Sequence, residues 1–161
     1  MDDSGHARIT DFGEAVVTKD EGFLEDYSEI AVTPRWAAPE VLEGRRWNKK
    51  SDIFSFAMVM IEVCHGSTMR RTLALSNFVY VQAFTGAIPF NKHIAATAMA
   101  FILQGERPAR PTHPTFTENL WELVQRCWAH DPDPRPDASE VLQILLAPAS
   151  VSKSFLRFLT R

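Results

Sequence analysis

The stretch SDIFSFAMVMIE, residues 51–62, decides the fold. Apolar side chains cover every side of a helix wound from these residues, so no polar stripe is left to face water. A helix of this kind belongs at the centre of a core, and we predict a central helix from about Ser51 to Glu62 that is buried on all sides. The apolar run from Ile53 to Cys64 contains Glu62 and is only 12 residues long, which is too short to cross a bilayer.

Further helices are expected after this stretch, and little helical signal precedes it. Five apolar residues fall on one helix face, namely Leu120, Leu123, Val124, Cys127 and Trp128. Asp137, followed three residues later by Glu140, predicts the capped start of a last helix. The prolines of 106–114 exclude helix there. Short runs at 7–10 and 15–17 suit two strands, and 18–33 suits a long loop. The fold class is therefore mainly α, with a small β remnant at the N-terminal edge.

Composition excludes several classes of protein. The chain has 161 residues, enough for one domain, and its 17 basic and 20 acidic residues form no basic stripe that would bind nucleic acid. The N-terminal residues lack the basic start and apolar run of a secretory signal, and two cysteines cannot make a disulfide framework. We therefore expect a cytoplasmic protein with no membrane and no nucleic-acid partner. Cys127 and His130 stand at metal-like spacing, but a zinc site needs four ligands and no second pair lies near.

A series of short motifs runs along the chain in order: Asp11-Phe12-Gly13, Thr33-Pro34-Arg35-Trp36-Ala37-Ala38-Pro39-Glu40, Ser51-Asp52-Ile53-Phe54-Ser55-Phe56, Thr85-Gly86-Ala87-Ile88-Pro89-Phe90, Gly105-Glu106-Arg107-Pro108, Arg126-Cys127-Trp128 and Asp131-Pro132-Asp133-Pro134-Arg135-Pro136. This series resembles the C-terminal lobe of a protein kinase catalytic domain, from the DFG motif to the last helix. The tryptophan-rich style is similar to the tyrosine-kinase-like group of fungal type. The resemblance implies a partial kinase domain over 1–147 and a C-terminal tail over 148–161.

The resemblance implies a nucleotide-binding role for the first motif. Asp11, Phe12 and Gly13 match the cofactor-binding DFG motif, in which the aspartate holds the Mg²⁺ that bridges the phosphates of ATP. A hard cation prefers carboxylate oxygen, so Asp11 is the candidate metal ligand. The structural alternative for this residue is a plain turn aspartate.

The activation segment of the resemblance spans 11–40. Thr33 matches the residue beside the acceptor site of the substrate, and its presence favours serine or threonine over tyrosine as the acceptor. Thr18, Tyr27 and Ser28 are possible phosphorylation sites, because they lie where relatives are often phosphorylated; the interpretation favoured for any one of them is a solvated loop hydroxyl.

Three further residues match structural positions of the family. Glu40 is expected to form a buried ion pair with Arg135 that locks the end of the activation segment to the helices. Asp52 is expected to cap the central helix and to hydrogen-bond the backbone of the catalytic loop.

Several parts that phosphoryl transfer requires have no counterpart in these 161 residues. No G-x-G occurs among the seven glycines, the strand lysine has no match, and the catalytic base is expected upstream of Met1. We therefore expect ATP and Mg²⁺ as cofactors of an intact parent, no tight binding of either by this chain, and no activity of the isolated chain. Expected partners are a protein substrate or a partner kinase. The alternative is a non-catalytic, pseudokinase-like interaction module.

Residues 63–82 interrupt the resemblance, because relatives run directly from the central helix into the T-G-x-x-P-F motif. Two origins remain open. The stretch can be a genuine insertion, or a retained intron, since Val63-Cys64-His65, Ser76-Asn77 and Gln82 can be encoded by splice-like sequences. We expect 66–77 to pack poorly, and Phe84 and Phe90 to return to the core.

Overall fold

The computed structural model describes residues 12, 33–45, 47–65, 88–112 and 116–147, with the side chains of 63–65 left aside. The two expected strands, the loop at 18–32, most of the insertion and Phe84 lie outside these residues. The described part is helical: α1 (Pro39–Leu42), α2 (Lys49–His65), α4 (Ala95–Leu103), α5 (Glu118–Cys127) and α6 (Ala138–Leu146). None of these helices is both long enough and apolar enough to span a bilayer.

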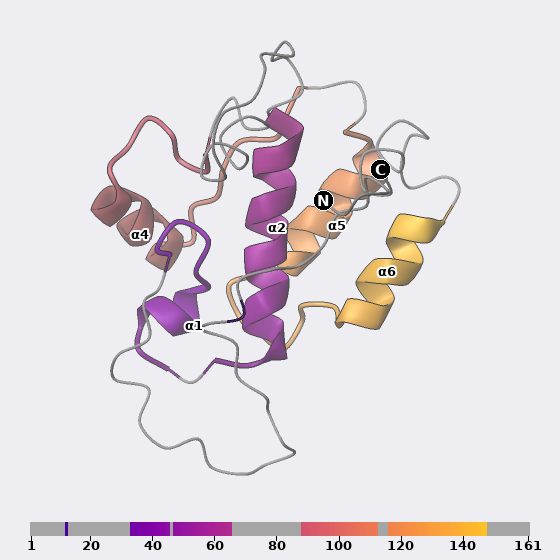
Figure 1. Cartoon of the computed structure of the whole chain (residues 1–161), viewed down its shortest axis with the longest axis horizontal. Coiled ribbons are helices and arrows are strands. Elements are labelled where there is room, and N and C mark those ends of the chain that lie inside the picture. The colour runs from indigo at the N-terminus through magenta and orange to yellow at the C-terminus, as the bar shows by residue number, and fades with distance from the viewer. Residues whose placement is uncertain (1–11, 13–32, 46, 66–87, 113–115, 148–161) are drawn as a thin grey trace.

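The central position predicted for α2 is confirmed (Figure 1). α2 packs against α5, and Phe54, Ala57 and Met58 have no exposed surface. The helix is longer than expected, since it begins at Lys49 and continues through His65. Its core is continuous with the buried residues of α5 and α6.

The expectation that α2 is buried on all sides is wrong along one stripe. Asp52 and Val59 are exposed, Val59 by 44%, and Phe56 between them is only partly buried. These three residues are spaced i, i+4 and i+7, so they share one face of the helix. Phe56 still packs against the core, so the uncovered part of this face lies at Asp52 and Val59.

α5 and α6 form as the sequence predicted. All five residues of the predicted α5 face are buried: Leu120, Leu123, Val124, Cys127 and Trp128. The Asp137 side chain accepts a hydrogen bond from the Glu140 backbone N–H, which is the predicted cap of α6. Residues 106–112 are not helical, as their prolines require.

Two glycines end helices in the left-handed conformation. Gly44 follows α1 with φ 75° and Gly105 follows α4 with φ 87°. The next residue donates to the carbonyl five residues earlier in each case, from Arg45 N to Glu40 O at 2.8 Å and from Glu106 N to Phe101 O at 2.8 Å. This is the Schellman arrangement, which favours glycine because it has no Cβ to clash.

Candidate functional site

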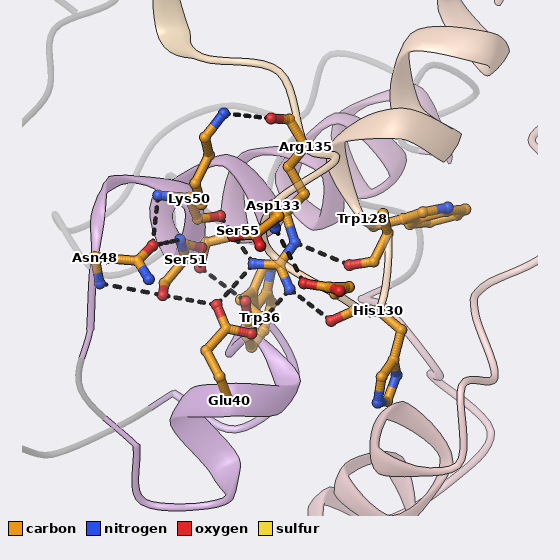
Figure 2. A network of polar contacts seen from close by, with 12 residues as sticks. Trp36, Glu40, Asn48, Lys50, Ser51, Ser55, Trp128, His130, Asp133 and Arg135 are labelled. Carbon is orange, nitrogen blue, oxygen red and sulfur yellow. Dashed lines mark hydrogen bonds and ion pairs between the residues drawn. The ribbon is translucent and has the colours of Figure 1, made fainter.

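Arg135 is the centre of the best-connected polar cluster in the described residues (Figure 2). Arg135 is 1% exposed, and all five N–H donors of its guanidinium group form hydrogen bonds. Nη1 donates to Glu40 Oε1 at 2.7 Å and Nη2 to Glu40 Oε2 at 2.8 Å. The other three donors reach the backbone carbonyls of Ala129, His130 and Lys50 at 2.9, 2.9 and 3.0 Å. The ion pair expected from the resemblance is therefore present, and it is bidentate.

Glu40 is held ionised by this arrangement. Burial alone would raise the pKa of its carboxyl, but the hydrogen bonds from Arg135 and Ser51, with the Arg135 charge, leave that pKa below its ordinary value. Ser51 Oγ donates to Glu40 Oε1 at 2.8 Å. The pair joins α1, the first turn of α2 and the loop before α6, which lie far apart in the sequence.

Two guanidinium groups lie close to the ring of Phe54 in α2. The Cζ of Arg135 is 5.1 Å from the ring centroid and the Cζ of Arg107 is 5.0 Å from it. Burial, with a smaller effect of the nearby Arg135 charge, lowers the pKa of Arg107 to about 10. Arg107 also donates to Trp128 O at 3.0 Å, so it ties the linker after α4 to the end of α5. Sequence reasoning quoted Arg107 within a motif but gave it no role.

The turn formed by residues 33–36 is anchored to α2 by Trp36. Trp36 N donates to Thr33 O at 3.1 Å and closes the turn. Ser55 Oγ donates to Trp36 O at 2.9 Å, and Trp36 Nε1 donates to Glu62 Oε2 at 2.8 Å. Burial raises the pKa of Glu62, an effect that the indole hydrogen bond partly offsets. The second carboxylate oxygen, Glu62 Oε1, is buried and has no hydrogen-bond partner.

Arg35 anchors the same turn to the segment before α4. Nη1 donates to Pro89 O at 3.1 Å and to Phe90 O at 2.9 Å, and Nη2 donates to His93 O at 2.5 Å. Phe90 has a positive φ of 55°, a conformation that costs a non-glycine residue about 1–2 kcal/mol. The hydrogen bond to its carbonyl helps to hold that conformation. Phe90 packs against the core as expected, with its ring centroid 5.9 Å from that of Phe101.

Of the residues expected at the substrate and nucleotide side, the structure describes two. Thr33 is exposed at the start of the anchored turn, and Phe12 is exposed as well. Asp11, Gly13, Thr18, Tyr27 and Ser28 lie outside the described residues, so the structure places none of them.

The cap of α2 is a correction to the sequence analysis. Because the helix begins at Lys49, its N-cap is Asn48, whose Oδ1 accepts hydrogen bonds from Lys50 N at 2.8 Å and Ser51 N at 3.1 Å. Ser51 Oγ in turn accepts from Asn48 N at 3.3 Å, which completes a reciprocal cap. Asp52 is four residues after Asn48, too far into the helix to cap it. Nothing in the described residues tests its expected bond to a catalytic loop.

No group of three or more metal-ligating side chains occurs in the described residues. Burial raises the pKa of the Cys127 thiol to about 12. His130 is exposed. Cys127 is the last residue of α5, and His130 lies in the segment that follows the helix.

The chain matches one protein family over residues 1–145, the family described as protein tyrosine and serine/threonine kinase. It is 30% identical to serine/threonine-protein kinase STY17 and 32% identical to serine/threonine-protein kinase STY46, both of Arabidopsis thaliana, over 90% of its length. It is 31% identical to dual specificity protein kinase pyk3 of Dictyostelium discoideum over 88% of its length. The chain spans 21% of each Arabidopsis relative and 9% of pyk3.

Proposed function

Because the chain belongs to the protein tyrosine and serine/threonine kinase family, we propose that residues 1–147 form the C-terminal lobe of a kinase that phosphorylates serine or threonine in proteins. The observation that carries this proposal is the doubly anchored turn at 33–36. Trp36 fastens it to α2 and Arg35 fastens it to 89–93, while Thr33 stays exposed at its start. A surface that receives a polypeptide substrate needs this combination of fixed backbone and accessible side chain.

The ion pair between Glu40 and Arg135 also supports this proposed role. It fixes the helix that follows the turn to the body of the lobe through buried, charge-assisted hydrogen bonds. In this proposal Glu40 and Arg135 are positioning residues that keep the turn in place. Thr33 is the substrate-adjacent residue.

Asp11 is proposed to hold Mg²⁺ in the complete kinase, with Phe12 and Gly13 completing the nucleotide-side motif. A carboxylate is the chemically appropriate ligand for this hard cation. When bound, Mg²⁺ with ATP supplies the phosphoryl group and neutralises the charge of its oxygens. The chain's own contribution is the Asp11 carboxylate together with the anchored turn at 33–36.

The 161-residue polypeptide alone is proposed to be inactive. Its sequence contains no G-x-G loop to cover the phosphates. The exposed side chain of Val59 supports the same conclusion, because an apolar residue of a central helix ordinarily has a packing partner. We propose that the remainder of a kinase lobe packs there.

A phosphate-transfer assay tests the inactivity directly. The chain is incubated with radiolabelled ATP, Mg²⁺ and a generic protein substrate, beside the Asp11→Asn variant as a matched control. We expect both to give only background incorporation. Incorporation by the parent chain above that of the variant would show that the polypeptide is a complete catalyst and would refute this part of the proposal.

A further inference from the structure

Residues 90–93 form a tight turn, the Lys92 turn, which Arg35 and α4 hold in place. His93 N donates to Phe90 O at 2.9 Å and closes the turn. Arg35 donates to the carbonyl oxygens of Phe90 and His93, at 2.9 and 2.5 Å. The rings of the same two residues lie against Phe101 of α4, with centroids 5.9 and 4.9 Å from that of Phe101. Because these contacts fix both ends of the turn, its exposed tip at Lys92 has a defined position.

The backbone of the Lys92 turn is consistent with a role in binding. Phe90 has a positive φ of 55°, a conformation that residues other than glycine rarely adopt. Such conformations persist where the surrounding structure enforces them, and they are concentrated at ligand-binding sites. Arg35 helps to enforce this one, and it also belongs to the turn at 33–36 that begins with the exposed Thr33. The Lys92 turn is therefore joined directly to the turn proposed to receive the substrate.

The surface that the two turns share is basic. The segments 33–38 and 88–105 contain Arg35 and Lys92 but no aspartate or glutamate. None of the ion pairs among the described residues involves either of these two cations. The hydrogen bonds of Arg35 run to backbone carbonyls, which carry no net charge, so they do not neutralise it. Glu62, the carboxylate that anchors the first of the two turns, is buried and does not reach this surface.

We propose that Lys92 binds an anionic side chain of the polypeptide substrate, so that acidic or phosphorylated substrates are preferred. This inference rests on the proposed function, because it takes the turn at 33–36 as the surface that receives the substrate. The exposed ammonium of Lys92 is a compact charge with three donors, which suits the oxygens of a carboxylate or a phosphate. The charge of Arg35, held between the two turns, adds to the attraction.

The preference should depend on the position of the anionic residue in the substrate. Lys92 is fixed relative to the turn at 33–36, so an anionic side chain can reach it from only one or two positions of a bound peptide. An exposed ion pair of this kind changes affinity by about two- to fivefold at low ionic strength, and added salt should weaken the effect. A general attraction to a positive surface would not depend on position, which separates the two cases.

Peptide binding to the full chain tests the proposal by fluorescence anisotropy. The probes are labelled, alanine-rich peptides with one central serine and a single glutamate placed in turn at each other position, so that all have the same net charge. We expect binding about two- to fivefold tighter for glutamate at one or two neighbouring positions. Lys92→Gln should abolish this preference without changing urea unfolding, and the matched control Lys49→Gln, at another exposed lysine, should retain it. Equal affinity at every position, a preference that survives Lys92→Gln, or no saturable binding would overturn the proposal.

Two further arms of the experiment identify the ligand and the contact. Phosphoserine in place of the preferred glutamate distinguishes the two sources of negative charge: tighter binding assigns a phosphorylated substrate, and equal or weaker binding assigns an acidic one. Lys92→Glu should reverse the preference toward a peptide with lysine at the same position, and an unreversed preference would contradict the contact. None of these measurements requires phosphate transfer. Transfer without the preference, by a chain completed with the N-terminal part of a kinase, would refute this inference alone, whereas the preference without transfer by such a chain would refute the proposed function alone.

Discussion

Replacing Glu40 by alanine is the most informative single change, because Arg135 would stay buried while it lost its carboxylate. Two of the five donors of Arg135, one on Nη1 and one on Nη2, would lose acceptors at 2.7 and 2.8 Å. Ser51 Oγ would lose its acceptor as well. The remaining bonds of Arg135 run to backbone carbonyls and cannot neutralise its charge.

The size of the effect follows from these contacts. Removing one partner of a buried ion pair costs about 3–5 kcal/mol of unfolding free energy. Because each Nη atom keeps one carbonyl acceptor, we expect Glu40→Ala to lie near the lower limit, at about 3 kcal/mol. Glu40→Gln keeps the shape and one acceptor, so about 1–2 kcal/mol is expected. A domain of ordinary stability, about 5–15 kcal/mol, survives either change.

Urea unfolding followed by circular dichroism measures these differences. A double-mutant cycle with Arg135→Met isolates the pair, since the doubly substituted chain has no stranded charge and should lose less than the sum of the single losses. The pKa of Glu40 is lowered on folding, so its contribution is present above the ordinary value of 4.5 and is lost as the pH falls through the lowered pKa. The parent and Glu40→Ala should therefore converge in acid. A loss under about 1 kcal/mol, or additive single losses, would refute the reasoning.

Three further predictions follow from individual contacts. Asn48→Ala should cost about 1 kcal/mol in urea unfolding while Asp52→Ala costs less, because Asn48 supplies the cap of α2; the reverse order would restore the cap to Asp52. The pKa of Glu62 is raised by burial against its ordinary value of 4.5, so the stability of the parent should fall as the pH rises through the raised pKa. Glu62→Gln should remove that slope, and an unchanged slope would show that another group titrates. Deleting 63–82 should raise the melting temperature, because it removes a stretch expected to pack poorly and joins the central helix directly to the residues before the T-G-x-x-P-F motif, as the resemblance implies for relatives; a lower melting temperature would mark the stretch as part of the fold.

The helices were predictable from the sequence where the signals are local. The buried face of α5 follows from the spacing of Leu120, Leu123 and Val124, and the start of α6 follows from Asp137 three residues before Glu140. The exposure of Val59 was not predictable, because an apolar pattern does not say which neighbours are present to cover it. The cap at Asn48 was missed because the family pattern drew attention to Asp52, although asparagine is a strong capping residue by itself.

The candidate site depended more on the resemblance than on local rules. Glu40 and Arg135 are 95 residues apart, and no periodicity connects them, so only the ordered motifs could pair them. The hydrogen bonds of Arg35 to three carbonyls could not be predicted in this way. Their acceptors are backbone oxygens, which every residue has, so the amino-acid sequence does not mark them. A signal did exist for Glu62, since a carboxylate within the most apolar stretch of the chain needs a donor, which Trp36 supplies.

The most direct test of the central claim is phosphate transfer by a chimera. Residues 1–10 are replaced by the N-terminal part of one of the matched serine/threonine kinases, ending before its own DFG motif, and the junction is made at Asp11. If residues 11–147 are a kinase C-terminal lobe, the chimera should transfer radiolabelled phosphate from ATP to serine and threonine of myelin basic protein, and Asp11→Asn in the same chimera should abolish the transfer. A folded chimera that transfers no more phosphate than its Asp11→Asn control would contradict the account.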